Sequence, residues 1–245
     1  MTKNILEEID IARLARWDAE SLLRYALEVF GQRAAIGTSL QKTGVVAIHM
    51  AHAFGEPFRV FFIDTLMNNP ETHEFRGEVE QRYGITIERF TPTDREVEDL
   101  YREWGQHAHY FNRTWCCHVR KTFPLHRAME TLDCWVAGLR ADQSDFRRRQ
   151  AAKVSWVRAP EGRKILKINP LFDWTEEQVE EYSRKNGVRH NKLFDYVSPY
   201  GERYKTIGCR TCHIPIKDDQ ESRAGKFPWE QGHRECGLHL DGDGI

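Results

Sequence analysis

The chain has 245 residues and a formal net charge of -1 at pH 7, so no overall positive field favours nucleic acid or an anionic membrane surface. Hydrophobic residues make up 40% and charged residues 30%, which is ordinary for a soluble globular protein. Residues 1–8 lack the apolar core of a signal peptide, and no apolar run approaches the ~20 residues that cross a membrane. The composition therefore predicts a cytoplasmic protein with reduced thiols.

Helical and strand patterns alternate along most of the chain. Residues 4–30 are polar but carry an apolar stripe at helical spacing, which predicts an N-terminal helical segment over 1–30. Short apolar runs predict strands at 34–36, 59–63, 85–90, 134–138 and 165–168. Helices are expected through Val45 to Ala53, from Pro70, from a cap at Asp94, and from a cap at Thr175 to about Asn186.

This alternation predicts an α/β fold, a mostly parallel sheet flanked by helices, in a single domain over 1–245. Past Gly187 the periodicity fades, which predicts a loop-rich C-terminal segment with a mobile tail over 220–245. Ligands bind such sheets at the carboxyl ends of the strands. The loops expected to hold a ligand are 37–43, 64–65 and 138–144.

Four of the six cysteines form two pairs. Cys116 and Cys117 are adjacent. Cys209 and Cys212 form a Cys-x-x-Cys, a spacing typical of metal ligands. Adjacent cysteines rarely converge on one zinc ion, whereas an iron–sulfur cubane offers a separate iron to each thiolate. The spacing therefore favours a [4Fe-4S] cluster over zinc, with two unrelated buried pairs as the alternative.

Two further cysteine patterns have simpler interpretations. The segment 209–213 also matches the Cys-x-x-Cys-His pattern of c-type haem attachment. Haem attachment requires export and leaves Cys116 and Cys117 unexplained, so we discount it. Cys134 lies within an apolar predicted strand, and we expect it in the core.

The sixth cysteine, Cys236, lies near the C-terminus within the pentapeptide Glu235-Cys236-Gly237-Leu238-His239. A thiol close to a chain end can close over a bound ligand and then reach a partner protein. By composition alone, a nucleophile and an incidental exposed cysteine account for it equally well.

These cysteines resemble those of assimilatory adenylyl-sulfate (APS) reductase, in the iron–sulfur branch of the sulfonucleotide reductases. The likeness runs from about residue 34 to residue 240, and it rests most on the pentapeptide and the two cysteine pairs. Supporting stretches are 64–65, 70–72, 120–121, 138–144, 169–175 and 223–226.

The resemblance implies an adenine-nucleotide α-hydrolase-like fold and the reduction of APS to sulfite and AMP. It implies that Cys236 attacks the sulfur of APS, and that thioredoxin or a similar dithiol protein releases sulfite from the resulting S-sulfocysteine. The implied [4Fe-4S] cluster stays oxidised and acts on substrate electrostatics through Lys121. The implied substrate contacts are Thr38, Ser39, Lys121, Arg140, Arg223, Lys226 and His239.

The sequence departs from the family pattern in three places. Residues 38–43 replace a loop that usually contains Ser, Gly and an acidic residue, although its backbone amides can still hold phosphate. Residues 66–69 read Leu-Met-Asn-Asn where the family commonly has Gly-Arg. Lys226 stands where arginine is common, and it keeps the charge but loses the bidentate fork. The choice between APS and its 3′-phosphorylated form, PAPS, therefore stays open.

Functions of other classes also stay open at this point. An ATP-dependent nucleic-acid thiolation enzyme belongs to the same fold family, but it calls for a Ser-Gly-Gly-x-Asp-Ser loop and a basic face, and neither is evident. A non-enzymatic zinc-binding module is another alternative, and iron and sulfide analysis separates it from the rest. The sequence leaves the oligomeric state open, a homo-oligomer included.

Overall fold

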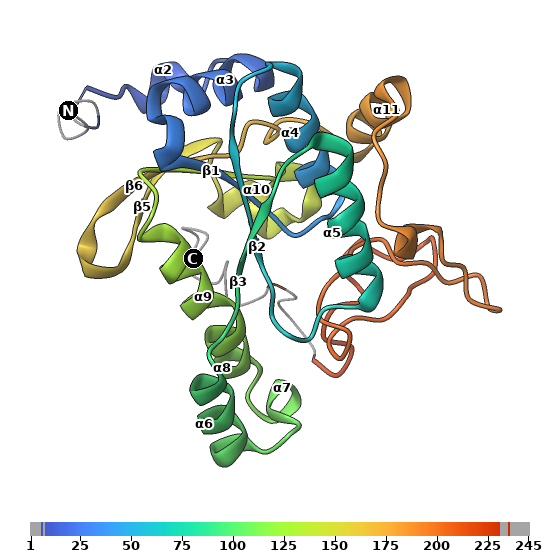
Figure 1. The fold of residues 1–245 in the computed structure, drawn as a ribbon. Helices are drawn as coiled ribbons and strands as arrows, with labels where there is room; N and C mark the ends of the chain where they lie inside the picture. Colours follow the sequence, from blue (N-terminus) through green and yellow to red (C-terminus); the bar gives the residue numbers. More distant parts are fainter. Residues whose placement is uncertain (1–5, 7, 231–234, 236–245) are drawn as a thin grey trace.

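The computed structural model describes residue 6, residues 8–230 and residue 235. A six-stranded sheet with the order β3-β2-β1-β4-β6-β5 forms its centre (Figure 1). The strands are β1 (Ala34–Thr38), β2 (Arg59–Ile63), β3 (Ile87–Phe90), β4 (Cys134–Ala137), β5 (Val154–Arg158) and β6 (Lys164–Ile168). Every neighbouring pair is parallel except β5 with β6, so the predicted mostly parallel sheet is confirmed.

Strand β5 is absent from the sequence-based prediction. It lies at the edge of the sheet and pairs with β6 alone. Only Val154 and Val157 of this strand are buried, because one of its edges faces solvent. Two buried positions give too weak an alternation for a sequence pattern to reveal the strand.

Most of the helices lie between strands in the chain, whereas α2 and α3 precede β1 and α11 follows β6. They are α2 (Ile11–Leu14), α3 (Ala19–Phe30), α4 (Lys42–Ala53), α5 (Pro70–Tyr83), α6 (Asp94–Trp104), α7 (Ala108–Phe111), α8 (Arg113–Cys117), α9 (Phe123–Met129), α10 (Asp145–Gln150) and α11 (Glu176–Asn186). A π-helix, His118–Thr122, joins α8 to α9. Single 3₁₀ turns lie at Gly31–Arg33, Ala141–Gln143, Pro160–Gly162 and Lys192–Asp195.

Capping boxes mark where two of these α-helices begin. Thr175 caps α11 in a capping box with Gln178, as predicted. The cap of α6 is Thr93, which forms a capping box with Glu96, and the prediction of Asp94 as the cap is wrong by one residue. Asp94 is instead the first helical residue, where its negative charge interacts favourably with the helix dipole.

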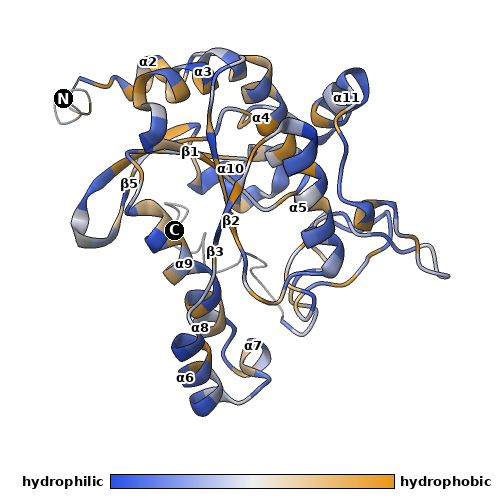
Figure 2. Cartoon of the chain, in the orientation of Figure 1, coloured by the Kyte–Doolittle hydropathy of each residue, from blue (hydrophilic) through white to orange (hydrophobic). Residues whose placement is uncertain are grey.

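Alternate residues of the central strands face two separate apolar cores. In β1, Ala34 and Ile36 pack into the larger core and Ala35 into the smaller one. Helices α3 and α4 cover the larger core, whereas α9 covers the smaller one. Cys134 lies in the larger core with no exposed surface, as expected, and burial raises the pKa of its thiol. Figure 2 shows the apolar strands enclosed by helices with mixed faces.

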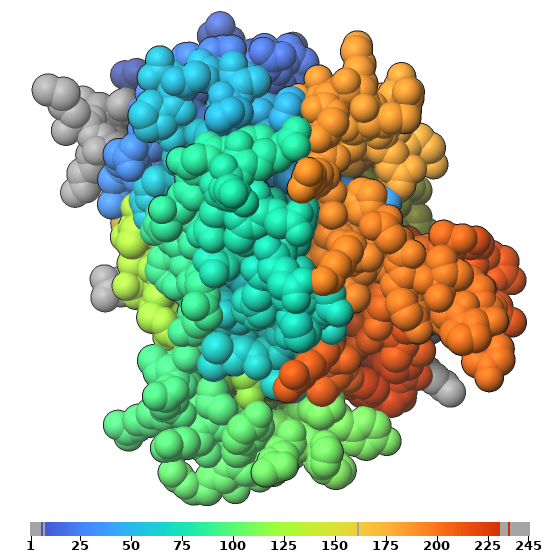
Figure 3. Space-filling view, turned by 45° about the vertical axis from the view of Figure 1, so that its right-hand side comes forward, coloured from blue at the N-terminus to red at the C-terminus, as the bar shows by residue number. Residues whose placement is uncertain are grey.

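The segment 187–230 contains no α-helix and no strand of the sheet, so the predicted loop-rich segment is confirmed over these residues. It packs along α5 (orange to red against green in Figure 3). One tie is Asn191, fully buried, whose Nδ2 donates to Thr72 Oγ1 at 3.2 Å. The described part of the predicted tail, residues 220–230 and residue 235, includes the buried Arg223, Phe227 and Glu235. In the described part of the chain, no helix has the length and apolarity needed to cross a membrane.

Candidate active site and metal centre

A cavity of about 230 Å³ opens at the carboxyl ends of the central strands. Its floor includes Gly37 and Thr38 at the end of β1, Ile63 at the end of β2 and Ala137 at the end of β4. Parallel strands end at the same edge of a sheet, and the crevice outside that edge is where such folds bind ligands. The cavity therefore lies where the sequence pattern placed a ligand.

Two aromatic rings close over Gly37. A Cβ atom at this position would lie 2.5 Å from Trp135 Nε1 and 2.6 Å from Phe61 Cζ, so only glycine leaves room for both rings. Trp135 and Phe61 also line the cavity. The Nε1 of Trp135 is buried without a hydrogen-bond partner in the described structure, which makes it an available donor to a ligand.

The loop after β1 carries the two expected contacts Thr38 and Ser39, and both line the cavity. Thr38 Oγ1 accepts a hydrogen bond from the backbone N–H of Leu40 at 2.9 Å. The next residue, Gln41, precedes α4 and provides no side-chain cap. The first N–H groups of α4 therefore lack a side-chain acceptor at their N-terminus, an arrangement that suits an anion.

The two loops that depart from the family pattern each contain a leucine in the left-handed region. Leu40 has φ 56° and Leu66 has φ 57°. A residue with a Cβ pays about 1–2 kcal/mol for this conformation. The Leu66 turn is compensated by the buried carboxylate of Asp64, which accepts from the Leu66 N–H at 3.0 Å. Both loops therefore form sharp turns despite their altered sequences.

Four cationic residues line the cavity: Lys121, Arg147, Arg223 and Lys226. Three of them are among the substrate contacts that the resemblance implies. The fourth, Arg147, lies in the first turn of α10, whose cap Ser144 accepts from the Arg147 N–H at 3.2 Å. The sequence reasoning missed it, although a Ser-Asp helix start next to the loop 138–144 was an available signal.

Arg140 does not line the cavity, contrary to expectation. Its guanidinium is buried, its Nε donates to Asp142 Oδ1 at 2.9 Å, and its other nitrogens contact Glu176 and Thr43. The two carboxylates balance its charge. Arg140 therefore joins the loop after β4 to α4 and α11, and its role as a substrate contact stays a prediction.

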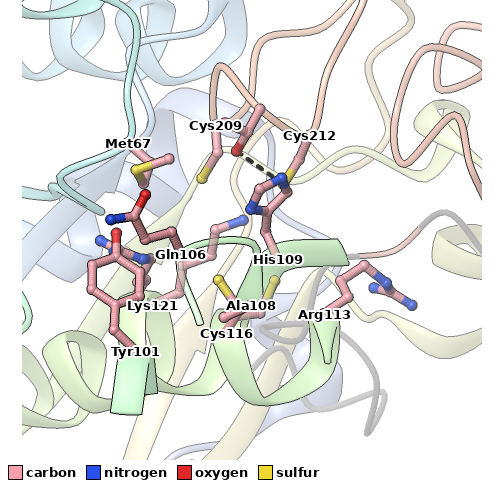
Figure 4. A pocket seen from close by; sticks show the side chains of 13 residues that line it. Met67, Tyr101, Gln106, Ala108, His109, Arg113, Cys116, Lys121, Cys209 and Cys212 are labelled. Atoms are coloured by element: carbon pink, nitrogen blue, oxygen red, sulfur yellow. Dashed lines mark hydrogen bonds between the residues drawn. The ribbon is translucent and has the colours of Figure 1, made fainter. Parts of the chain in front are cut away.

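A second cavity lies beside the first, and all four paired cysteines line it. Cys116 and Cys117 end α8, while Cys209 and Cys212 come from the C-terminal segment. Figure 4 shows the sulfur atoms of Cys209 and Cys212 facing the sulfur of Cys116 across this space. All four side chains are buried. Two cysteine pairs that lie about ninety residues apart in sequence thus meet at one place.

Thr65, at the end of β2, connects the elements that carry the two pairs. Its carbonyl oxygen accepts from Arg120 Nη1 of the π-helix at 2.8 Å. Its hydroxyl accepts from Cys209 Sγ at 3.3 Å. Nearby, the Arg210 N–H donates to the Met67 carbonyl at 2.8 Å. The predicted strand-end loop 64–65 therefore holds both halves of the sulfur-lined cavity.

Two of the four thiols, Cys116 and Cys212, lie where burial disfavours their ionised form. Burial and the neighbouring Cys117 raise the pKa of Cys116 to about 11, whereas nearby Arg120 lowers it. Burial and the neighbouring Cys209 raise the pKa of Cys212 to about 12. Thiolates in this cavity would therefore need cations as partners, and a bound metal is one possible source of positive charge. Among the described residues, no three His, Cys, Asp or Glu side chains are arranged around a single metal ion.

Lys121 lines both cavities, as does Cys209. Lys121 belongs to the π-helix that follows Cys117, a wider turn of a kind that is frequent at functional sites. The two remaining candidates, Cys236 and His239, lie outside the described residues.

Comparison with known proteins agrees with this arrangement. Residues 33–215 match the phosphoadenosine phosphosulfate reductase domain. An adenosine 5'-phosphosulfate reductase of Pseudomonas aeruginosa is 34% identical over 230 residues, which cover 92% of this chain and 84% of that protein. The 5'-adenylylsulfate reductase 1, chloroplastic, of Arabidopsis thaliana is 33% identical, over 98% of this chain and 54% of its own length.

Solved structures show the same fold. Phosphoadenylyl-sulfate reductase from Candida auris superposes with a TM-score of 0.66 at 26% identity, covering 82% of this chain and 94% of that one. FMN adenylyltransferase from Candida glabrata, at 12% identity and a TM-score of 0.55, covers 92% of this chain and 75% of its own and shares the fold alone. The adenine-nucleotide α-hydrolase-like fold is thereby confirmed. The chain belongs to the phosphoadenosine phosphosulfate reductase family.

Proposed function

We propose that this protein is an oxidoreductase of sulfate assimilation that reduces APS to sulfite and AMP. The relatives named APS reductases support the substrate, and the position of Lys121 carries the proposal. Lys121 lines a cavity of nucleotide size on one side and a sulfur-lined cavity on the other. One ammonium group thus serves both an anionic substrate and a metal centre.

The cationic side of the larger cavity suits the phosphosulfate group. Lys121, Arg147, Arg223 and Lys226 supply charged donors, and charge-assisted hydrogen bonds to phosphate-like oxygens are the strong ones. The N-terminus of α4 adds backbone N–H donors on the opposite side. Trp135 and Phe61 provide apolar surface at the floor of the cavity.

The four paired cysteines fit a [4Fe-4S] cluster. They are buried, they line one cavity, and the adjacent pair Cys116 and Cys117 suits a cubane, which offers a separate iron to each thiolate, better than a single zinc ion. Cys116, Cys117, Cys209 and Cys212 would each hold one iron. When bound, the cluster supplies positive charge that keeps the thiolates ionised and shapes the field at Lys121. Thiol chemistry of this kind belongs in a reducing compartment such as the cytoplasm.

The chemical steps fall to Cys236. Its thiolate attacks the sulfate sulfur, a sulfur–sulfur bond forms, and the bond from sulfur to the phosphate oxygen breaks to release AMP. A thioredoxin-like dithiol then attacks the Cys236 sulfur and expels sulfite, and its second thiol resolves the mixed disulfide. The dithiol supplies two electrons, so sulfur is reduced from the sulfate to the sulfite level. Lys121 and the cavity cations stabilise the charge that moves onto the AMP phosphate.

Sulfite release from APS and from PAPS, measured with thioredoxin on anaerobically purified protein, tests the proposal. We expect APS to be reduced and PAPS to be a poor substrate. Faster release from PAPS would assign the protein to the other substrate of its family. A protein that releases no sulfite from either nucleotide, and contains zinc without sulfide, would overturn the proposed function.

A further inference from the structure

Glu235 is a buried carboxylate next to the proposed nucleophile, with only 2% of its surface exposed. Its carboxylate oxygens accept hydrogen bonds from Ser144 Oγ at 3.1 Å, Arg147 Nη2 at 3.1 Å and Arg223 Nη2 at 2.8 Å. Its carbonyl oxygen accepts from Arg113 Nη1 at 2.7 Å. A carboxylate buried to this degree is stable only where cations and donors replace its hydration.

Two of these partners belong to the substrate cavity. Arg147 and Arg223 both line it, so Glu235 contacts two of the cations that we assign to the phosphosulfate. Two guanidinium groups contact this one carboxylate, so Glu235 brings one negative charge to two positive ones. Glu235 can therefore orient both guanidiniums without cancelling their attraction for an anion.

The main-chain contact ties the same residue to the metal centre. Arg113 belongs to α8, lines the sulfur-lined cavity, and also donates from its Nε to Glu230 at 2.6 Å. Its bond to the Glu235 carbonyl holds the backbone directly before Cys236. Consecutive Cα atoms lie about 3.8 Å apart, so a chain anchored at Glu235 restricts how far Cys236 can move from the cavity.

A carboxylate without cationic partners would lower the reactivity of a nucleophilic thiol beside it. A negative charge close to a thiol disfavours the thiolate, which is the reactive form. The bonds from Arg147 and Arg223 balance the charge of Glu235 and remove this penalty. The network thus combines a firm anchor with little electrostatic cost to Cys236.

We propose that Glu235 is a positioning residue, which anchors the chain carrying Cys236 to the two arginines that bind the phosphosulfate. The nucleophile and the sulfur that it attacks then take their positions from one pair of guanidinium groups, Arg147 and Arg223. Fixing two reacting groups against a common frame raises their effective concentration. This inference rests on the proposed function of Cys236.

A single-turnover experiment with saturating APS and no thioredoxin tests the positioning role. Glu235→Gln keeps the shape and removes the charge, and we expect sulfonation of Cys236 to slow by at least about tenfold. Glu235→Asp keeps the charge and should be less impaired. The affinity for AMP should stay within about threefold in both variants, because the arginines remain. If Glu235→Gln binds nucleotide more tightly and is sulfonated at the native rate, Glu235 competes with substrate and the proposal is wrong.

Glu221→Gln is the matched control. Glu221 is an exposed carboxylate on the same segment, and none of the described ion pairs includes it. This variant should retain the native sulfonation rate and AMP affinity. A comparable loss in Glu221→Gln would show that any lost carboxylate slows the reaction, which overturns a specific role for Glu235.

A measurement without substrate separates this proposal from the proposed function. The rate at which iodoacetamide alkylates Cys236, located by peptide mapping, is compared in folded and urea-unfolded protein. We expect Cys236 to be alkylated more slowly in the folded native protein than in the unfolded one. This protection should be at least about fivefold smaller in Glu235→Gln and partly restored in Glu235→Asp. Equal protection in native protein and both variants would overturn the anchor. Protection that depends on Glu235, in a native protein that is never sulfonated, would support the anchor and refute the proposed function.

Discussion

The sheet region, residues 34–186, and the C-terminal segment, residues 187–230, build the same site by different means. The sheet region is held by apolar side chains at regular spacing, which pack into two cores on opposite faces. The C-terminal segment has few such side chains and is held by individual contacts, such as those of Asn191 with Thr72 and of Cys209 with Thr65. The packing of the first region is shared among many apolar side chains, whereas the position of the second depends on single residues.

The comparison also separates two kinds of cation at the site. Arg140, in the sheet region, is neutralised by Asp142 and Glu176 and serves packing. Arg223, in the C-terminal segment, lines the cavity and shares the buried Glu235 with Arg147. The two arginines thus differ in their surroundings, and we predict a packing role for Arg140 and a substrate role for Arg223. The predictions below test this division, beginning with the largest expected effect.

Cys236→Ser should abolish sulfite release and leave both regions folded. Its serine hydroxyl is a far weaker nucleophile than a thiolate, and four other cysteines hold the proposed cluster. Incubation of the native protein with APS and no thioredoxin should add one sulfonate, which peptide mass mapping places on Cys236. An adduct on another cysteine, or full activity in Cys236→Ser, would contradict the assignment.

Cys212→Ala should remove the metal and loosen the C-terminal segment without unfolding the sheet. The described part of the segment has only a small apolar cluster, formed by Cys209, Cys212 and Phe227, so a bound metal cluster would contribute much of its stability. We expect the native protein to contain about four irons and four sulfides, and the variant to lose most of both. Proteolysis should cut the variant first within 187–230. Cys134→Ala, a cysteine of the sheet core, is the control and should keep its iron. A colourless native protein with stoichiometric zinc and full activity would exclude the cluster.

Lys121→Ala should lower activity strongly while the iron content stays native. Lys121 lines both cavities, so its loss removes a cation from the substrate and from the field between the two sites. We expect a loss of about 30-fold or more in kcat/KM, which corresponds to about 2 kcal/mol. Lys121→Arg should recover part of the activity through its charge. Activity within about twofold of the native value in Lys121→Ala would refute the role.

Arg147→Ala and Arg140→Ala should separate substrate binding from packing. Arg147→Ala should raise KM for APS by about tenfold, because a charged donor at the cavity is lost. Arg140→Ala should lower the free energy of unfolding by about 1–3 kcal/mol, because Asp142 and Glu176 lose a buried partner. Denaturant unfolding and steady-state kinetics on both variants measure the two effects. A raised KM in Arg140→Ala, together with a loss of stability in Arg147→Ala, would instead support Arg140 as the substrate contact.

Thr93→Ala should show the smallest effect, and this effect should be on stability alone. Thr93 caps α6, and loss of an N-cap side chain costs about 1 kcal/mol. The free energy of unfolding should fall by that amount, with iron content and kcat/KM unchanged. Asp94→Asn is the companion variant, since Asp94 is not the cap, and it should be less destabilising. An equal loss in Asp94→Asn would question the position of the cap.

The sequence by itself determined the scaffold and predicted the reactive residues. Strands such as 59–63 and the capped helix from Thr175 follow from hydrophobic period and local capping, which depend on neighbours only a few residues away. The two cysteine pairs likewise stand out by spacing. The edge strand Val154–Arg158 does not, because a strand that is buried on few positions leaves little pattern.

Only the tertiary structure decided which of these residues meet. No local pattern records that Thr65 connects the two cysteine pairs, or that Lys121 lines both cavities. The exchange of Arg140 for Arg147 at the cavity, and the burial of Glu235 against Arg147, depend on carboxylates and guanidiniums contributed by distant segments. The periodicity of hydrophobic residues indicates which side of a helix or strand is buried. The partner of a charged group, in contrast, is fixed by packing in three dimensions.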